Sequence, residues 1–400
     1  MGSVPQSQRV LSLPALRQRY QLEGEYPIPS VQHEYEILVR SEVIGLNPID
    51  WKAPDYGFGI PTLPYIPGRE LVGHVTSSTT STSRIQQGDR VAVISTDYRD
   101  LRKASYQDYV ISSHFNVVRL PLNTTSEQGA ATGVAFVTSA LALGICSGLD
   151  FSSIADGPDL IDIVRRIDPS RLPQDVREEC IRGIELAERP RKGDWVTIWG
   201  GSSTCAFIIN QLARLAGLRT IIVIDVRKHG LNLADSPALQ ADFVVDSHDP
   251  QRAIEIVRSV TGDALHFAID TVGRPTSESL AQCLQGYSSA TDSVQEPTPP
   301  GTPPSDVGNK VSRRTHLTGL TGLPKQQTGA VHHSVPVKLF HEIPEVGEAL
   351  VVWLERLLEQ GLLSPPRILG VVEGLEGIND GLDRMRKGEI SGGRLVARIR

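Results

Sequence analysis

The stretch from Trp195 to Asp225 constrains the fold of this 400-residue chain more than any other segment. It contains an apolar run, a turn of small residues, an amphipathic segment and a second apolar run, which predicts strand, turn, helix and strand. In such a unit the turn lets the backbone approach a pyrophosphate, and free N–H groups at the helix N-terminus bind its charge. The stretch therefore predicts a dinucleotide-binding site.

The turn matches the G-x-G-x-x-G fingerprint of dinucleotide sites only in part. It keeps the first glycine, and Ser203 and Ala206 follow at three-residue intervals. Small side chains still permit close approach, and hydroxyls can donate hydrogen bonds to phosphate oxygens. A buried β-α-β unit without a ligand is the alternative. The residues predicted to bind the cofactor here are Gly200, Gly201, Ser202, Ser203 and Thr204.

Composition and charge narrow the class of protein. The chain is 40% hydrophobic and carries a net charge of -6, which fits a globular protein of about two domains and argues against nucleic-acid binding. The four cysteines are far apart and form no C-x-x-C pair, so neither a zinc knuckle nor a disulfide framework is predicted.

Neither a targeting segment nor a membrane anchor is predicted. The first ten residues lack an apolar core, and no run of 18 apolar residues occurs in the sequence. We therefore expect a cytoplasmic protein with no membrane partner.

Residues 1–145 are predicted to form a β-rich domain, because short apolar runs alternate with Pro- and Gly-rich turns. Small and apolar residues then predict a helix over Glu127 to Leu143. The expected strands are Glu36 to Val39, Leu71 to Thr76, Arg90 to Ile94 and Ser105 to Ile111.

Residues 146–192 interrupt this pattern with charges of both signs and two short helical periodicities. Leu160 and Val164 belong to the first periodicity, and Val176 and Cys180 to the second. A mixed charge run is usually a solvated surface, so we predict an exposed helical insertion with no chemistry of its own.

Residues 193–345 are predicted to form a doubly wound parallel sheet, because strands alternate with helices. Within this domain, residues 287–314 are rich in Pro, Ser and Thr and predict a mobile surface loop. Residues 346–400, which contain an amphipathic helix and a final strand, are predicted to return to the first domain. The predicted segments are Asp242 to Asp246, Pro250 to Thr261, Leu265 to Thr271, Ser277 to Leu284, His316 to Leu323, Val346 to Glu359 and Leu395 to Ile399.

Several motifs, taken in order, resemble those of the medium-chain dehydrogenase/reductase superfamily. They are NPID (47–50), PGRE (67–70), GDRV (88–91), ASYQDYV (104–110) and GEISGGRLV (388–396). The resemblance implies an α/β protein with an N-terminal GroES-like β-barrel domain and a Rossmann-type doubly wound parallel sheet domain. The GGSSTCA turn, the helical insertion and LTGLPK (320–325) resemble in particular the trans-acting enoyl reductases of fungal polyketide synthases.

The resemblance implies an oxidoreductase without zinc. Zinc-dependent relatives carry a cysteine where this chain has Asn47, and a histidine where it has Arg69, which would repel the metal. Asp50, Glu70 and His74 are scattered polar residues that include no thiolate, so we predict no metal site. The chemistry implied is reduction of activated C=C bonds, with hydride transfer to the β-carbon and protonation at the α-carbon.

Four residues are predicted to take part in that chemistry through the resemblance. Asn47, Lys52 and Tyr56 are expected to face the nicotinamide cleft, with Tyr56 as the candidate proton donor. Thr138 matches the position whose hydroxyl meets the nicotinamide ribose or carboxamide. The alternatives are an exposed loop tyrosine, a solvated lysine, and a threonine that bonds back to its own helix.

A strand end and one aromatic residue are further candidates. Gly319, Leu320 and Thr321 correspond to the strand end that flanks the nicotinamide, so we predict that they bind the cofactor. Phe340 corresponds to a residue that lines the substrate pocket, although a single aromatic residue is more often part of the core.

The residues that select the cofactor give conflicting signals. Asp225 ends the second strand where a carboxylate would bind the ribose 2'-hydroxyl of NAD. Arg227, Lys228 and His229 follow at once, and this basic trio suits a 2'-phosphate. Because the enoyl reductases it resembles generally use NADPH, we predict NADPH, with NADH as the alternative and Asp225 turned aside or paired with Arg227.

The expected function is an NADPH-dependent enoyl reductase that acts in trans on a carrier-bound substrate, with a polyketide synthase as partner and the monomer favoured over the homodimer. One alternative is a quinone or small-enone oxidoreductase that acts on free substrates. Another is a non-catalytic NADP(H)-binding protein.

Overall fold

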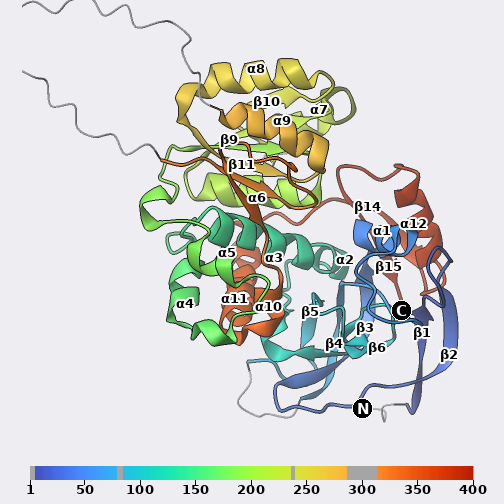
Figure 1. Ribbon diagram of the computed structural model, residues 1–400. Helices are drawn as coiled ribbons and strands as arrows, with labels where there is room; N and C mark the ends of the chain where they lie inside the picture. Colours follow the sequence, from blue (N-terminus) through green and yellow to red (C-terminus); the bar gives the residue numbers. More distant parts are fainter. Residues whose placement is uncertain (1–4, 79–83, 236–238, 286–312, 400) are drawn as a thin grey trace, which may run out of the picture.

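A computed structural model describes residues 5–78, 84–235, 239–285 and 313–399. Figure 1 shows a parallel sheet flanked by helices above a second, β-rich part in which both chain termini lie. Within the described residues, none of the helices combines the length and the apolar content needed to cross a membrane. Of the loop predicted to be mobile, residues 287–312 lie outside the described residues.

The parallel sheet confirms the predicted Rossmann-type fold. Its six strands are hydrogen-bonded in the order β10-β9-β8-β11-β12-β13, and every neighbouring pair is parallel. Numbered from β8, this is the 3-2-1-4-5-6 order of doubly wound nucleotide-binding sheets, whose switch point lies between β8 and β11. The strands are β8 (Trp195–Trp199), β9 (Arg219–Ile224), β10 (Phe243–Asp246), β11 (Leu265–Asp270), β12 (His316–Gly319) and β13 (Val331–Ser334).

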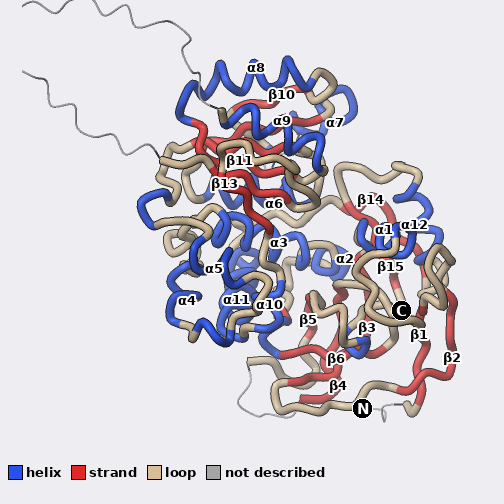
Figure 2. The backbone as a smooth tube through the Cα atoms, viewed as in Figure 1, coloured by secondary structure: helices blue, strands red, loops and turns tan. Residues whose placement is uncertain are grey.

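Helices cover both faces of this sheet, as Figure 2 shows. Along β8, Val196 and Ile198 belong to the apolar cluster that contains α6, whereas Trp195 and Trp199 belong to the cluster that contains α8 and α9. Successive side chains of a strand point to opposite faces, so a continuous apolar strand is buried on both sides. The helices are α6 (Thr204–Leu215), α7 (Val226–Asp235), α8 (Pro250–Thr261) and α9 (Arg274–Leu284).

The second part is a mixed seven-stranded sheet whose strands follow the order β14-β15-β3-β4-β5-β7, with β6 paired to β3. Because β15 pairs antiparallel with β3, the last strand of the chain lies beside one of the first. A separate hairpin, β1 (Ser7–Ser12) and β2 (Gln21–Pro27), precedes it. The sheet strands are β3 (Glu36–Gly45), β4 (Glu70–Ser78), β5 (Arg90–Ile94), β6 (Tyr109–Ser113), β7 (Val117–Arg119), β14 (Ile368–Glu373) and β15 (Arg394–Arg398).

The single helix predicted over Glu127 to Leu143 is wrong in one respect. The segment forms α2 (Ser126–Ala130) and α3 (Gly133–Leu141), followed by a π-helical turn over Ala142–Cys146. The break has long-range causes. A Cβ on Gly133 would lie 2.5 Å from Cγ1 of Ile94, and the Val134 N–H in the first turn of α3 donates to Oε2 of Glu70 on β4 at 2.9 Å.

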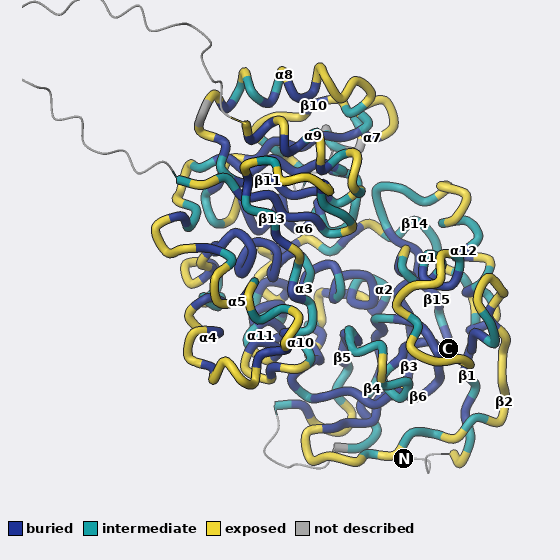
Figure 3. The backbone as a smooth tube through the Cα atoms, viewed as in Figure 1, coloured by how far each residue is buried: buried dark blue, intermediate teal, exposed yellow. Residues whose placement is uncertain are grey.

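The helical insertion is packed rather than exposed, which corrects the prediction of a solvated surface. Leu160, Val164 and Cys180 are buried in the same apolar cluster as α6 and α11, and Figure 3 shows buried backbone within the insertion. Trp353 of α11 lies 4.5 Å, centroid to centroid, from Phe151. The insertion's apolar stripes extend the core, and most of its charges are exposed, although Glu188 is buried and Glu179 faces His333. The helices concerned are α4 (Leu160–Arg166), α5 (Arg177–Arg182) and α11 (Pro344–Glu359).

Acid should destabilise the fold partly through His341 in α10 (Lys338–Glu342). Burial lowers the pKa of this imidazole to about 4, and its Nδ1 lies 2.7 Å from Oγ1 of Thr96. His341 is therefore protonated near pH 6.5 in the unfolded chain but only near pH 4 in the folded protein. As the pH falls through this interval, the free energy of unfolding decreases. We expect urea-unfolding midpoints of His341→Gln to fall less steeply between these pH values. If the midpoints of His341→Gln and of the unchanged protein fell in parallel with pH, His341 would not be a source of the acid destabilisation.

Candidate active site

The loop after β8 is shaped for close backbone approach. Gly200 has φ of +89°, and the N–H groups of Gly200 and Gly201 both donate to the carbonyl of Val223, at 3.0 and 3.1 Å. A Cβ on Gly201 would lie 2.0 Å from Cγ2 of the buried Ile222. Both glycines are therefore required by local geometry, and the loop is held against β9 at the switch point.

Ser203 caps the helix that follows this loop. Its Oγ accepts a hydrogen bond from the N–H of Ala206 at 3.0 Å and donates one to Oγ1 of Thr271 at 2.9 Å. The Thr271 hydroxyl also lies 3.0 Å from the carbonyl oxygen of Gly200. The Ser203 side chain thus connects the loop after β8 to the residue after β11. Its hydroxyl proton is donated to Thr271. These contacts give Ser203 a positioning role in the loop, and its direct bond to a phosphate stays a prediction.

Replacing Ser203 by alanine tests that role. Loss of an N-cap costs about 1 kcal/mol of stability, and the loop should lose its anchor to Thr271, so NADPH binding weakens as well. Ser202→Ala is the matched control for the loss of the helix cap, because Ser202 belongs to the same loop, also lines the cavity and does not cap α6. Urea unfolding and cofactor titration of both variants provide the measurement. If Ser203→Ala weakened binding without any loss of stability, the hydroxyl would contact the phosphate directly.

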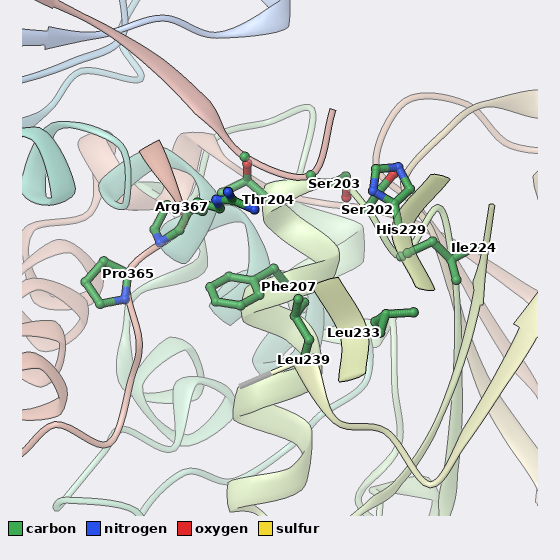
Figure 4. A pocket seen from close by; sticks show the side chains of 14 residues that line it. Ser202, Ser203, Thr204, Phe207, Ile224, His229, Leu233, Leu239, Pro365 and Arg367 are labelled. Atoms are coloured by element: carbon green, nitrogen blue, oxygen red, sulfur yellow. The ribbon is translucent and has the colours of Figure 1, made fainter. Parts of the chain in front are cut away.

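A cavity of about 420 Å³ opens beside this loop. The loop residues 201–204 line it together with α6, α7 and two segments near the C-terminus, residues 365–367 and 392–393. In Figure 4, Arg367 and Thr204 lie toward one side of the cavity, and His229 and Ser202 toward the other. The cavity therefore joins the carboxyl ends of the parallel strands to the returning C-terminal segment, which is where ligands bind in such sheets.

Among the lining residues, His229 belongs to the basic trio predicted to suit a 2'-phosphate, whereas Arg367 was not predicted from sequence. Arg367 follows a Pro-Pro pair in a loop, and His229 lies on α7 with its Nε2 3.1 Å from Oγ of Ser391. The Gly392-Gly393 pair in the C-terminal motif was the available signal, since a Cβ on Gly392 would lie 3.0 Å from the His229 ring.

The residues predicted to select the cofactor take a different arrangement. Asp225 Oδ1 accepts a hydrogen bond from the N–H of Lys228 at 2.9 Å, and its Oδ2 lies 3.6 Å from Nε2 of His248. It is thus turned aside, but toward His248 rather than Arg227. Arg227 and Lys228 are exposed on α7 and are not among the described residues that line the cavity.

Asn47 lies in a buried polar cluster in the β-rich part. It is the N-cap of α1 (Pro48–Tyr56), and its side-chain amide donates to Oε1 of Glu70 at 3.0 Å. Oδ2 of Asp50 accepts the Asn47 N–H at 2.8 Å and the Tyr106 hydroxyl at 2.9 Å. Burial raises the pKa of Asp50 to about 6. This cluster fixes the start of α1 against β4.

The position that holds catalytic zinc in metal-dependent relatives does not fit a metal here. The Glu70 carboxylate accepts from the Asn47 amide and the Val134 N–H, and it forms a buried ion pair with Arg394. His74 points elsewhere and pairs with Glu42 at 3.3 Å. The acceptors of Glu70 are therefore satisfied by nitrogen donors, and a guanidinium supplies the positive charge that a metal would supply.

Lys52 and Tyr56 are on the same helix as Asn47 but outside its cluster. Tyr56 is 69% exposed and its ring centroid lies 6.3 Å from that of Trp51. The Lys52 Nζ lies 5.6 Å from the Trp51 ring centroid. Both side chains thus lie at the surface, and the structure does not bring them together with Asn47.

The remaining predicted residues separate into two groups. Thr138 donates from Oγ1 to the carbonyl of Val134 at 2.8 Å, which is the back-bonded arrangement of a helical threonine. Gly319, Leu320 and Thr321 end β12 at the carboxyl edge of the sheet, beside the switch-point strand β11. Phe340 is fully buried in the core, which corrects its assignment to a substrate pocket.

Two family matches agree with this fold and site. The alcohol dehydrogenase GroES-like domain matches residues 33–122, and the zinc-binding dehydrogenase family matches residues 207–319, so together they match about half the chain. The chain belongs to the medium-chain dehydrogenase/reductase superfamily of oxidoreductases.

Within that superfamily the chain is similar to fungal enzymes of one kind. The trans-enoyl reductase thnE of Trichoderma harzianum is 23% identical over 100% of this chain and 98% of the relative. The trans-enoyl reductase caaB of Aspergillus niger is 25% identical over 92% of this chain and 91% of the relative.

Solved structures share the fold. A mycobacterial protein solved with NADPH superposes with a TM-score of 0.67 at 17% identity, covering 98% of this chain and 100% of that one. A quinone oxidoreductase from Coxiella burnetii gives 0.65 at 16% identity, covering 98% and 99%.

Proposed function

We propose that the protein is an NADPH-dependent reductase of activated C=C bonds, and specifically a trans-acting enoyl reductase of polyketide biosynthesis. The observation that carries the proposal is the cavity beside the loop after β8, bounded by this capped loop, by the end of β9 and by the C-terminal segment. Similarity over the full chain to trans-enoyl reductases supports the choice of substrate. The proposed substrate is an enoyl thioester on a carrier, and the proposed partner is a polyketide synthase that the monomeric protein meets in the cytoplasm.

NADPH is the proposed cofactor because the residue that would favour NAD is engaged. Asp225 caps α7 through the Lys228 N–H and faces His248, which leaves its carboxylate poorly placed for a ribose hydroxyl. Positive side chains border the same region, with Arg367 in the cavity and Arg227 exposed on α7. A solved relative in complex with NADPH is consistent with this choice. A kcat/KM for NADH about tenfold above that for NADPH would overturn it.

The residues present fit NADPH, and the proposed reaction needs no zinc. When bound, NADPH supplies a hydride to the β-carbon of the substrate. The free N–H groups at the start of α6 would hold its pyrophosphate, and Gly319, Leu320 and Thr321 would flank the nicotinamide end. Asn47 and Lys52 remain the residues proposed to face the nicotinamide cleft. Tyr56 remains the candidate proton donor, and the Thr138 hydroxyl would meet the nicotinamide ribose or carboxamide.

Enoyl thioesters and quinones presented to the same preparation test the proposal. NADPH consumption should be fast with a crotonyl or longer enoyl thioester on a carrier protein, slower with the same acyl group on a short thiol, and absent with the saturated thioester. Recovery of the saturated acyl product by mass spectrometry should match the NADPH consumed. Turnover of free quinones alone would favour the quinone oxidoreductase alternative. Cofactor binding without turnover of any of these substrates would favour a non-catalytic role.

A further inference from the structure

Three potential metal ligands of different kinds meet where the insertion contacts the parallel sheet. Cys146 ends the π-helical turn after α3, Glu179 lies on α5, and His333 lies on the edge strand β13. One ligand atom from each lies within 4.8 Å of the other two. Cys146 and His333 are buried, and the Glu179 side chain is 17% exposed. Three elements far apart in the sequence thus converge on one small volume.

We propose that Cys146, Glu179 and His333 form a structural zinc site that fastens the insertion to the edge of the sheet. A thiolate, an imidazole and a carboxylate are all ligands that Zn²⁺ accepts, and the mixture suits zinc better than magnesium or calcium. The proposal is independent of the reductase function, because none of the three residues belongs to the cofactor cavity. It also differs from the expectation of a zinc-free protein, which concerned the catalytic position and a cysteine cluster.

The surroundings of His333 support a ligand role. Its Nδ1 faces Glu179, with Oε1 at 2.7 Å, while its Nε2 lies 2.9 Å from Nδ1 of His316. With zinc on Nδ1, the Nε2–H would donate to His316, as the second ring nitrogen of a zinc-bound histidine usually does toward an acceptor. The Nε2 of His316 lies 3.7 Å from Glu188, and Arg314 neutralises that carboxylate. The hydrogen bond to His316 therefore fixes the orientation of the His333 imidazole, and the Glu188 carboxylate lies next to the far side of His316.

The site needs only small movements to accept the metal. Zinc binds its ligands at ~2.0–2.3 Å, so tetrahedral ligand atoms stand about 3.5 Å apart. The His333 and Glu179 atoms, now 2.7 Å apart, must separate by less than about 1 Å. The backbone carbonyl of Ser334 lies 3.9 Å from the Cys146 sulfur and is near enough to be the fourth ligand, with water as the other candidate.

A second group of potential ligands lies on the surface and has to be separated from this site. Asp225, Asp246 and His248 also place one ligand atom each within 4.8 Å, but they are half-buried or exposed and contain no sulfur. Cobalt bound there would lack the sulfur-to-metal charge-transfer absorption that a cysteine thiolate produces. His248→Ala removes one ligand of that group and leaves the buried site intact.

Cobalt substitution in the full-length protein tests the proposal. Protein freed of metal by chelation is titrated with Co²⁺ in the His248→Ala background. We expect one cobalt per chain, with charge-transfer absorption in the near ultraviolet and the visible bands of tetrahedral cobalt, both displaced by Zn²⁺. Zinc should also raise the unfolding temperature, because it binds only the folded arrangement.

Substitutions of the three proposed ligands test whether the cobalt absorption bands arise from this site. Cys146→Ser should abolish the charge-transfer band, and Glu179→Gln, on a partly exposed side chain, should weaken cobalt binding by more than about tenfold without unfolding the protein. Cys283→Ser is the matched control, because this cysteine lies on α9, is buried in the cluster that α9 forms with α8, and should leave the spectrum unchanged when replaced. The proposal is overturned if the metal-free protein binds no stoichiometric cobalt, or if the charge-transfer band survives in Cys146→Ser or persists at full strength in Glu179→Gln.

Discussion

Gly200→Ala is expected to weaken NADPH binding by about 100-fold, which corresponds to about 2.7 kcal/mol. The residue has φ of +89°, where an L-side chain is strained, and the added Cβ would lie 2.4 Å from Oγ1 of Thr271 and 2.5 Å from Cγ2 of Val272. The Thr271 hydroxyl cannot retreat without losing its bonds to Ser203 and to the loop carbonyls. The loop itself must therefore shift away from the place where a pyrophosphate would bind. Fluorescence titration with NADPH measures the effect.

Gly193→Ala is the control that separates strain from collision. Gly193 precedes β8, has the same φ of +89°, and a Cβ there would have no atom within 4 Å. Both variants should lose about 1–2 kcal/mol of stability from the left-handed backbone. Only Gly200→Ala should lose cofactor affinity. Equal affinity losses in the two variants would show that backbone strain, and not the contact with Thr271, causes the effect.

The fold could be predicted where local pattern and long-range packing agree. The central strands and helices of the parallel sheet are apolar or amphipathic along their whole length, so Pro250 to Thr261 was predicted with the bounds that the structure has. Prediction from sequence failed where residues far apart in the chain determine where a helix begins or whether a segment is buried. The break before α3 depends on Gly133 packing against Ile94, and the burial of the insertion depends on Trp353, which lies far along the chain. Because that segment carries many charges, it was predicted to be exposed, although its apolar residues face the core.

The candidate site shows the same division. The small-residue loop was recognised because its glycines are adjacent in sequence to the strand that they follow. Arg367 was missed, because only the folding of the C-terminal segment onto α7 brings it to the same cavity as His229. The partner of Ser203 could not be predicted for a related reason. Its hydroxyl is satisfied by Thr271, a residue 68 positions away, and no local pattern reveals that partner.

Arg394→Leu is expected to destabilise the protein by about 3–5 kcal/mol, because it leaves the charge of Glu70 buried without its counter-ion. The side chains of the pair are only 6% and 1% exposed, and the Asn47 amide and Val134 N–H cannot replace the lost positive charge. Urea unfolding measures the loss. Arg398→Leu, on the same strand, is the matched control. Its partners Glu127 and Glu373 are partly exposed, so its ion pairs should contribute less than about 1 kcal/mol.

The double variant Glu70→Gln/Arg394→Leu decides why the pair matters. If the cost of Arg394→Leu comes from an uncompensated charge, removing that charge should restore most of the lost stability. The amide oxygen introduced by Glu70→Gln would still accept the Val134 N–H, so α3 could begin where it does. If the double variant is no more stable than Arg394→Leu alone, the guanidinium stabilises β15 through packing instead. Recovery of stability without recovery of reductase activity would show that the charged side chains of Glu70 and Arg394 matter for the reaction beyond their part in folding.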